Sequence, residues 1–134
     1  MMILLFTVFI NIVGTQDIRK SLPDGYDDYL VELDRDSFFD SIALKKCFVL
    51  FYTEDSKVCS LMSYNLNNIA KTNQGKTNFY KVDLSKYPEY DLKYNISGVP
   101  NIFIFDDGEE VNRIMGVVPE HNLKIIFDKT IKQQ

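Results

Sequence analysis

Cys47 and Cys59 are the two cysteines among the 134 residues, and Ser56 stands three positions before Cys59. A thiolate can exchange with a disulfide, whereas a serine hydroxyl is too weakly acidic to attack one. With a single histidine in the chain, the two thiols cannot complete a four-ligand zinc site. The residues therefore point to thiol chemistry and predict neither a metal site nor a cofactor.

The two cysteines are predicted to lie in different elements. Cys47 opens the apolar run 47–53 (CFVLFYT), which is typical of a strand covered on both faces. A helix is predicted from about Ser56 to Lys71, with an apolar face of Leu61, Met62, Leu66 and Ile69. The strand should separate the thiols by roughly 20 Å, and a disulfide needs Cα atoms within about 7 Å. Cys47 is thus interpreted as apolar filler and Cys59 as the candidate for chemistry. Cys59 could equally be an inert buried thiol, and Ser56 is also a preferred helix N-cap.

Composition limits the class of protein. The formal net charge is -4, so no basic field exists to attract nucleic acid or an anionic membrane surface. Two cysteines are too few for a disulfide framework, whereas ten Phe and eight Tyr provide a large apolar core. The length suits one globular domain.

An apolar run, residues 2–13 (MILLFTVFINIV), precedes every Lys and Arg of the chain. It is shorter than the roughly 20 residues that cross a bilayer and suits the apolar region of a signal peptide. The sequence predicts a signal peptide at 1–15, a polar lead-in at 16–28, and export to the periplasm, the cell exterior or the ER lumen, with no stable membrane anchor after cleavage. The alternative is an N-terminal strand or an uncleaved anchor.

The remaining elements follow from apolar periodicity and turn residues. An early helix capped by Asp34 or Asp36 is predicted to bury one apolar face, and a hairpin turn at Asp106, Asp107 and Gly108 is predicted to join two strands. The predicted order is βαβαβαββα, an α/β fold with a central mixed sheet and helices on both faces. The predicted strands are 29–33, 47–53, 79–84, 101–105 and 110–115, and the apolar face of the early helix is Phe38, Phe39, Ile42 and Leu44.

These segments together resemble the thioredoxin family over 31–131. The resemblance is carried by Phe51-Tyr52-Thr53-Glu54 leading into Ser56-Lys57-Val58-Cys59, by the strand ending at Asp83, and by Gly98-Val99-Pro100, with the hairpin 105–108 and Gly116 following in order. The resemblance implies a three-layer α/β/α sandwich over 29–134. It also implies a cis bond before Pro100, facing the Ser56–Cys59 motif.

The motif departs from the family pattern at three positions. The family's attacking cysteine is replaced by Ser56, its buried acid by Leu50, and its frequent Trp by Asp55. Cys59 stands where the family keeps its resolving cysteine. A self-sufficient dithiol reductase is therefore not expected.

Two functions remain open. The first is thiol–disulfide exchange, or formation of mixed disulfides, between Cys59 and client proteins that carry thiols or disulfides. The second is a redox-inactive module that binds extended peptides beside the cis-proline. In the first, Ser56 and Cys59 form the reactive motif; in both, the client lies between the Ser56–Cys59 segment and the cis-proline loop and contacts Lys57, Val58, Val99 and Pro100. No nucleic-acid partner is expected.

Overall fold

The computed structural model describes residues 28–132, so the predicted signal peptide and nearly all of the predicted lead-in lie outside the described residues. Strands and helices follow one another in the predicted order βαβαβαββα. In chain order they are β1 (Val31–Glu32), α2 (Phe38–Ile42), β2 (Lys46–Tyr52), α3 (Lys57–Thr72), β3 (Asn78–Asp83), α4 (Glu89–Tyr94), β4 (Asn101–Asp106), β5 (Glu109–Met115) and α5 (Glu120–Lys132).

The five strands form one mixed sheet in the order β1-β3-β2-β4-β5. β2 is central: it runs parallel to β3 and antiparallel to β4, while β1 is parallel to β3 and β5 is antiparallel to β4. Every residue of β2 from Cys47 to Phe51 is buried, as its continuous apolar run predicts.

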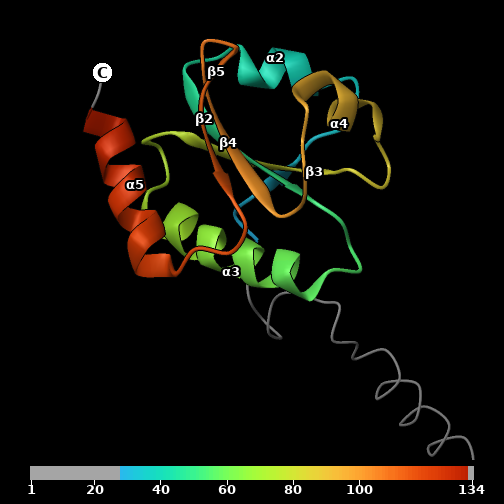
Figure 1. Cartoon of the computed structure of the whole chain (residues 1–134). Helices are drawn as coiled ribbons and strands as arrows, with labels where there is room; N and C mark the ends of the chain where they lie inside the picture. The colour runs from blue at the N-terminus through green and yellow to red at the C-terminus, as the bar shows by residue number, and fades with distance from the viewer. Residues whose placement is uncertain (1–27, 133–134) are drawn as a thin grey trace, which may run out of the picture.

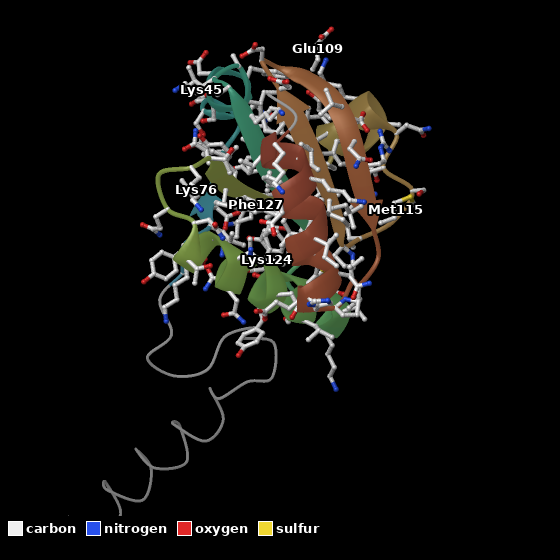
Figure 2. The ribbon with its side chains drawn as sticks, turned by 90° about the vertical axis from the view of Figure 1, so that its left-hand side faces the viewer. Lys45, Lys76, Glu109, Met115, Lys124 and Phe127 are labelled. Carbon is white, nitrogen blue, oxygen red and sulfur yellow. The ribbon has the colours of Figure 1, made fainter. Side chains whose placement is uncertain are left out.

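Helices cover both faces of the sheet, which confirms the predicted α/β/α layering (Figure 1). On one face, α3 and α5 pack over the α3/α5 core, where Phe48, Phe79 and Phe127 lie with ring centroids 5.5–5.7 Å apart. Figure 2 looks onto α5 lying across this face. On the other face, α2 and α4 cover the α2/α4 core, in which Phe38 contacts the ring of Tyr90 at 4.5 Å.

The β4–β5 hairpin turns as its sequence predicts. Asp106 pairs with Glu109, so Asp107 and Gly108 alone form the loop. Their φ angles, 51° and 88°, are both positive, as a type I′ turn requires. The turn packs on the end of α2, where Asp107 donates its amide to the Lys45 carbonyl at 3.2 Å.

Three local predictions were wrong. The first strand, predicted at 29–33, is only Val31–Glu32, because this part of the chain pairs with β3 at just two positions. Phe39 and Leu44 are about half exposed, since α2 is five residues long and offers the core only the narrow stripe of Phe38 and Ile42. The N-cap of α2 is Ser37, where Asp34 or Asp36 was predicted, because Asp34 accepts the Ser37 amide in the turn just before the helix.

Among residues 28–132, no helix is long and apolar enough to cross a membrane.

Candidate functional site

Ser56 is the N-cap of α3, and its side chain is already in use. The Cys59 amide donates a hydrogen bond to Ser56 Oγ at 3.2 Å, with Ser56 in an extended conformation just before the first helical residue. Such a bond satisfies one of the amide groups left open at the start of a helix. In this arrangement the Ser56 hydroxyl oxygen serves as an acceptor for the helix.

Cys59 lies in the first turn of α3 and is only 2% exposed. Lys57 and Val58, which precede it, are exposed. Cys59 and Cys47 are both free, which confirms that no disulfide joins them. Cys59 is therefore reached from solvent only when the first turn of α3 or its surroundings move.

Cys47 lies away from this motif, at the opposite end of β2. It is fully buried in the α2/α4 core, and burial raises the pKa of its thiol to about 12. This confirms its interpretation as apolar filler. Burial without a charged partner disfavours the thiolate, so Cys47 has no means of acting as a nucleophile in the folded protein.

The loop before β4 reaches the same edge of the sheet as the start of α3. The Val99–Pro100 bond is cis, as predicted. β2 and β4 are antiparallel with Phe51 opposite Asn101, so the chain enters β4 beside the point where β2 leaves for α3. The structure thus brings the Ser56–Cys59 and Val99–Pro100 segments to one edge. Val99 is half-buried and Pro100 is buried.

A third segment at this edge, residues 116–118, went unrecognised by sequence reasoning apart from Gly116. Gly116 donates its amide to the Pro100 carbonyl at 2.9 Å. Asn65, a buried residue of α3, donates from Nδ2 to the Val118 carbonyl at 2.9 Å. The Asn65 bond ties the helix that carries Cys59 to the segment that holds Pro100. Asn65 is one of three buried polar residues of α3, with Ser63 and Asn67, and nothing in the sequence distinguishes it from the other two.

Apolar side chains are exposed on the segments of this edge. Val58 and Leu61 of α3 are about half exposed, and Val117 is 39% exposed. Leu61 was predicted to face the core, and its exposure is a correction: the buried stripe of α3 runs instead through Cys59, Met62, Leu66 and Ile69. Exposed apolar side chains beside a polar rim are typical of surfaces that bind another molecule.

Leu50 of β2, which stands where an acid was predicted to be missing, has apolar surroundings. Leu50 is completely buried in the α3/α5 core and pairs across the sheet with Lys81. Lys81 forms its ion pair elsewhere, with Asp28 at 2.5 Å. No proton acceptor therefore stands at position 50, as expected.

A polar cluster lies next to Lys81 at the end of β2. Tyr52 donates its hydroxyl to the two carboxylate oxygens of Glu32 at 2.7 and 2.9 Å. Burial raises the pKa of Glu32, and burial together with Glu32 raises the pKa of Tyr52. The Tyr52 hydroxyl is thus committed to Glu32 and remains neutral over the physiological range.

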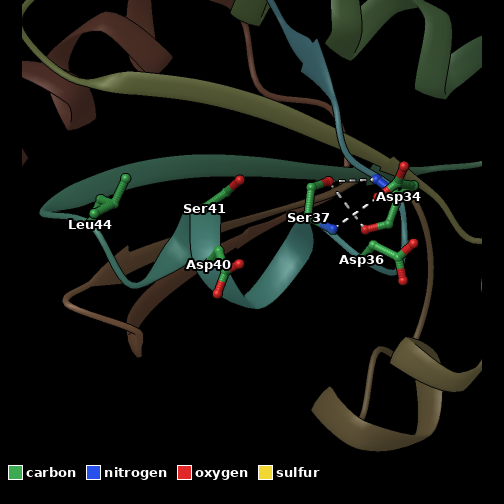
Figure 3. A pocket seen from close by; sticks show the side chains of 6 residues that line it. All are labelled: Asp34, Asp36, Ser37, Asp40, Ser41 and Leu44. Atoms are coloured by element: carbon green, nitrogen blue, oxygen red, sulfur yellow. Dashed lines mark hydrogen bonds between the residues drawn. The ribbon is translucent and has the colours of Figure 1, made fainter.

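A pocket of about 440 Å³ lies elsewhere, beside α2 (Figure 3). It is lined by Asp34, Asp36, Ser37, Asp40, Ser41 and Leu44. Asp34 and Ser37 bond reciprocally: the Ser37 amide donates to Asp34 Oδ1 at 2.9 Å and the Asp34 amide to Ser37 Oγ at 3.0 Å. These bonds lower the pKa of Asp34. Both side chains therefore serve to stabilise the turn that precedes α2. Within residues 28–132, no group of three or more His, Cys, Asp or Glu is placed to hold a metal ion.

Comparison with known proteins agrees with this geometry. The family model for thioredoxin matches residues 29–129. A thioredoxin of Staphylococcus epidermidis is 32% identical over 95 residues, which cover 70% of this chain and 91% of the relative. A thioredoxin of Staphylococcus saprophyticus is 27% identical over 100 residues, covering 75% of this chain and 96% of the relative.

Proposed function

Because this chain belongs to the thioredoxin family, we propose that it exchanges thiols and disulfides with client proteins through the single thiol of Cys59. The observation that carries the proposal is the position of Cys59: the first turn of α3, at the sheet edge shared with the cis-proline loop and bordered by exposed Val58. Cys47 is excluded by its burial and by its pKa of about 12. One working thiol defines what the chemistry can be.

The exchange has two balanced steps. The Cys59 thiolate attacks one sulfur of a client disulfide; a new Cys59–client disulfide forms and the other client sulfur leaves as a thiolate. The thiolate of a low-molecular-weight thiol, or a different cysteine thiolate of the client, then attacks the client sulfur of the mixed disulfide, and Cys59 leaves as a thiolate. An outside thiol leaves the client with one free thiol and one disulfide to that outside thiol; a second outside thiol completes the reduction and leaves as the outside disulfide. A different client thiolate forms a new disulfide within the client, so the client is rearranged without net oxidation or reduction.

The client would bind at the edge described above. An extended segment can lie against the backbone of Val99, before the cis bond, while its apolar side chains cover Val58 and Leu61. Lys57 is the exposed cation of this motif. Because Cys59 is 2% exposed, exchange requires the first turn of α3 to open. In this proposal the opening occurs when a client binds at the edge.

The test is direct capture. The full chain carrying Cys47→Ala is incubated with a peptide containing one intramolecular disulfide, and the adduct is followed by intact mass. We expect one peptide bound per chain, released by reduced glutathione, with Cys59→Ala added as the control that forms no adduct. Absence of an adduct under conditions where denatured chain reacts would refute the exchange function.

A second function, peptide binding without a covalent step, is favoured by the burial of Cys59 and by the hydrogen bond that Ser56 Oγ accepts from the Cys59 amide. In it, the edge binds extended peptides of partner proteins and no covalent step occurs. A serine-substituted version of the peptide separates the two. Equal affinity for the disulfide and serine peptides with no adduct supports the binding module, whereas an adduct supports exchange.

We further propose that residues 1–15 are removed on export. The apolar run at 2–13 is the support for this step. The mass of the mature N-terminus after expression in a secreting host tests it: a chain beginning near Gln16 is expected, and an intact Met1 or Met2 terminus in the exported fraction would contradict cleavage.

A further inference from the structure

Arg113 lies on β5 and is not among the site residues predicted from the sequence. Its guanidinium contacts two backbone carbonyls, a carboxylate and an aromatic ring. Nη2 donates to the Tyr94 carbonyl at 3.0 Å and Nη1 to the Asn95 carbonyl at 3.2 Å. Nε and Nη2 also bind the carboxylate of Glu110 at 2.5 and 2.8 Å, and the guanidinium carbon is 4.2 Å from the centroid of the Phe103 ring.

The two carbonyls belong to the end of α4. Tyr94 is its last residue and Asn95 is its C-cap, with a left-handed φ of 51°. Carbonyls at a helix C-terminus lack intrahelical donors and carry partial negative charge, so a cation there is stabilising. Arg113 therefore fixes the point where α4 ends and residues 96–100 begin.

The segment that follows is anchored again at its other end. Pro100 is buried, and its carbonyl accepts from the Gly116 amide at 2.9 Å. Between the two ends, Ser97 and Gly98 are exposed, and Asn101 reaches the Gly98 carbonyl only at 3.5 Å, the limit of a hydrogen bond. The path of residues 97–99 is thus set by its two anchored ends, of which Arg113 holds the one at the end of α4.

We infer that Arg113 is a positioning residue that sets the path of residues 96–99 and so presents the Val99 backbone to a client. This inference rests on the proposed function for its consequence, although the placement of the segment can be measured without any client. Charge alone would not suffice, because the two carbonyls and the Glu110 carboxylate are met together by the planar fork of arginine.

The test uses Arg113→Lys in the full chain, with Arg35→Lys as a matched control. Arg35 likewise pairs with a carboxylate, Glu89, and lies 5.1 Å from an aromatic ring, that of Tyr87, but at the opposite end of α4. The amides of Asn95 and Ile96 bond to the Leu92 and Asp91 carbonyls at 3.4 and 3.0 Å, at the start of the segment that Arg113 holds. Their hydrogen exchange should be about tenfold faster in Arg113→Lys, the equivalent of about one lost hydrogen bond, and unchanged in Arg35→Lys.

The functional readout separates positioning from simple destabilisation. In Arg113→Lys the rate of adduct formation with the peptide disulfide should fall about tenfold, while the rate with a small aromatic disulfide, which needs no backbone pairing, stays within about twofold. A second variant, Glu110→Gln, leaves the donors to both carbonyls in place and should behave as wild type in both assays.

Each result decides a different point. Unchanged amide exchange in Arg113→Lys, faster exchange without slower peptide capture, or an equal loss in Glu110→Gln would overturn the role of Arg113. If the wild type forms no adduct with the peptide, the exchange function fails instead, and amide exchange alone still decides whether Arg113 places the segment.

Discussion

The two cysteines are equally hidden from water but are covered by very different structures. Cys47 lies in the central strand, beneath the α2/α4 core that includes Phe38, Phe105 and Tyr90. Cys59 is covered by one turn of helix and its neighbours at the sheet edge. A reagent reaches Cys47 only through global unfolding, whereas a local opening of α3 suffices for Cys59. Accessibility in the static structure is therefore a poor guide to which thiol can react.

The largest effect expected from this difference is in alkylation. With iodoacetamide at pH 8, the Cys59 thiol of the folded chain should be alkylated at least about a hundredfold faster than the Cys47 thiol, since local openings cost less free energy than global unfolding. Peptide mass spectrometry after timed quenching measures both rates in one sample. In strong denaturant the two rates should converge. Equal slow rates in the folded chain would place Cys59 with the inert thiols and remove the exchange function.

A second thiol at position 56 should increase the difference in reactivity between the α3 motif and Cys47. In Ser56→Cys, the new thiol stands at the open end of α3, where the helix N-terminus stabilises a thiolate, and one turn from Cys59. We expect insulin reduction by the wild type at background and at least about a tenfold gain in the variant, because a lowered thiol pKa raises the reactive fraction. Ser56→Ala should stay at background. Robust turnover by the wild type would show that the missing attacking thiol is not needed.

The high pKa of Cys47 predicts how stability depends on pH. The folded-state pKa of about 12 lies above the ordinary value of 9.0, so the unfolded chain loses this proton first as the pH rises. The contribution is complete below pH 9 and declines above it by up to about 1.4 kcal/mol per pH unit until about pH 12. Cys47→Val, which does not ionise, should show a correspondingly flatter decline in urea unfolding between pH 9 and 10.5. Parallel curves for both proteins would contradict a buried neutral thiol.

The fold was predictable because its signals are local and mutually consistent. The continuous apolar run at 47–53 predicted a fully covered strand, and Asp106-Asp107-Gly108 predicted a hairpin turn, in which Asp107 and Gly108 both have positive φ angles in the structure. Errors arose where tertiary contacts decide. Leu61 is apolar at helical spacing, yet half exposed, because α3 turns a different stripe toward the sheet.

The candidate site was predictable only in part. Ser56, Cys59 and the cis Val99–Pro100 bond could be located from the motif and its resemblance. Asn65 and Arg113 could not, because their roles consist of bonds to carbonyls more than 15 positions away in sequence, and no local pattern encodes such partners. Side-chain-to-backbone ties of this kind emerge only when the elements are packed.

The smallest predicted effect concerns the cap that covers Cys59. Ser56→Ala removes the acceptor of the Cys59 amide and should lower the free energy of unfolding by about 1 kcal/mol. Ser85→Ala, at an exposed turn position whose side chain caps no helix, is the matched control and should change stability by less than about 0.5 kcal/mol. Urea unfolding at pH 7 measures both.

The alkylation rates of the same variant identify the opening that exposes Cys59. Global unfolding breaks the Ser56 cap, so loss of about 1 kcal/mol should speed Cys47 about fivefold. If Cys59 is exposed by unwinding of the first turn of α3, that opening breaks the cap too, and Cys59 must accelerate by the same factor. Acceleration of Cys47 alone would mean that Cys59 is reached with the cap intact, and the first turn of α3 would then not be the gate over the thiol.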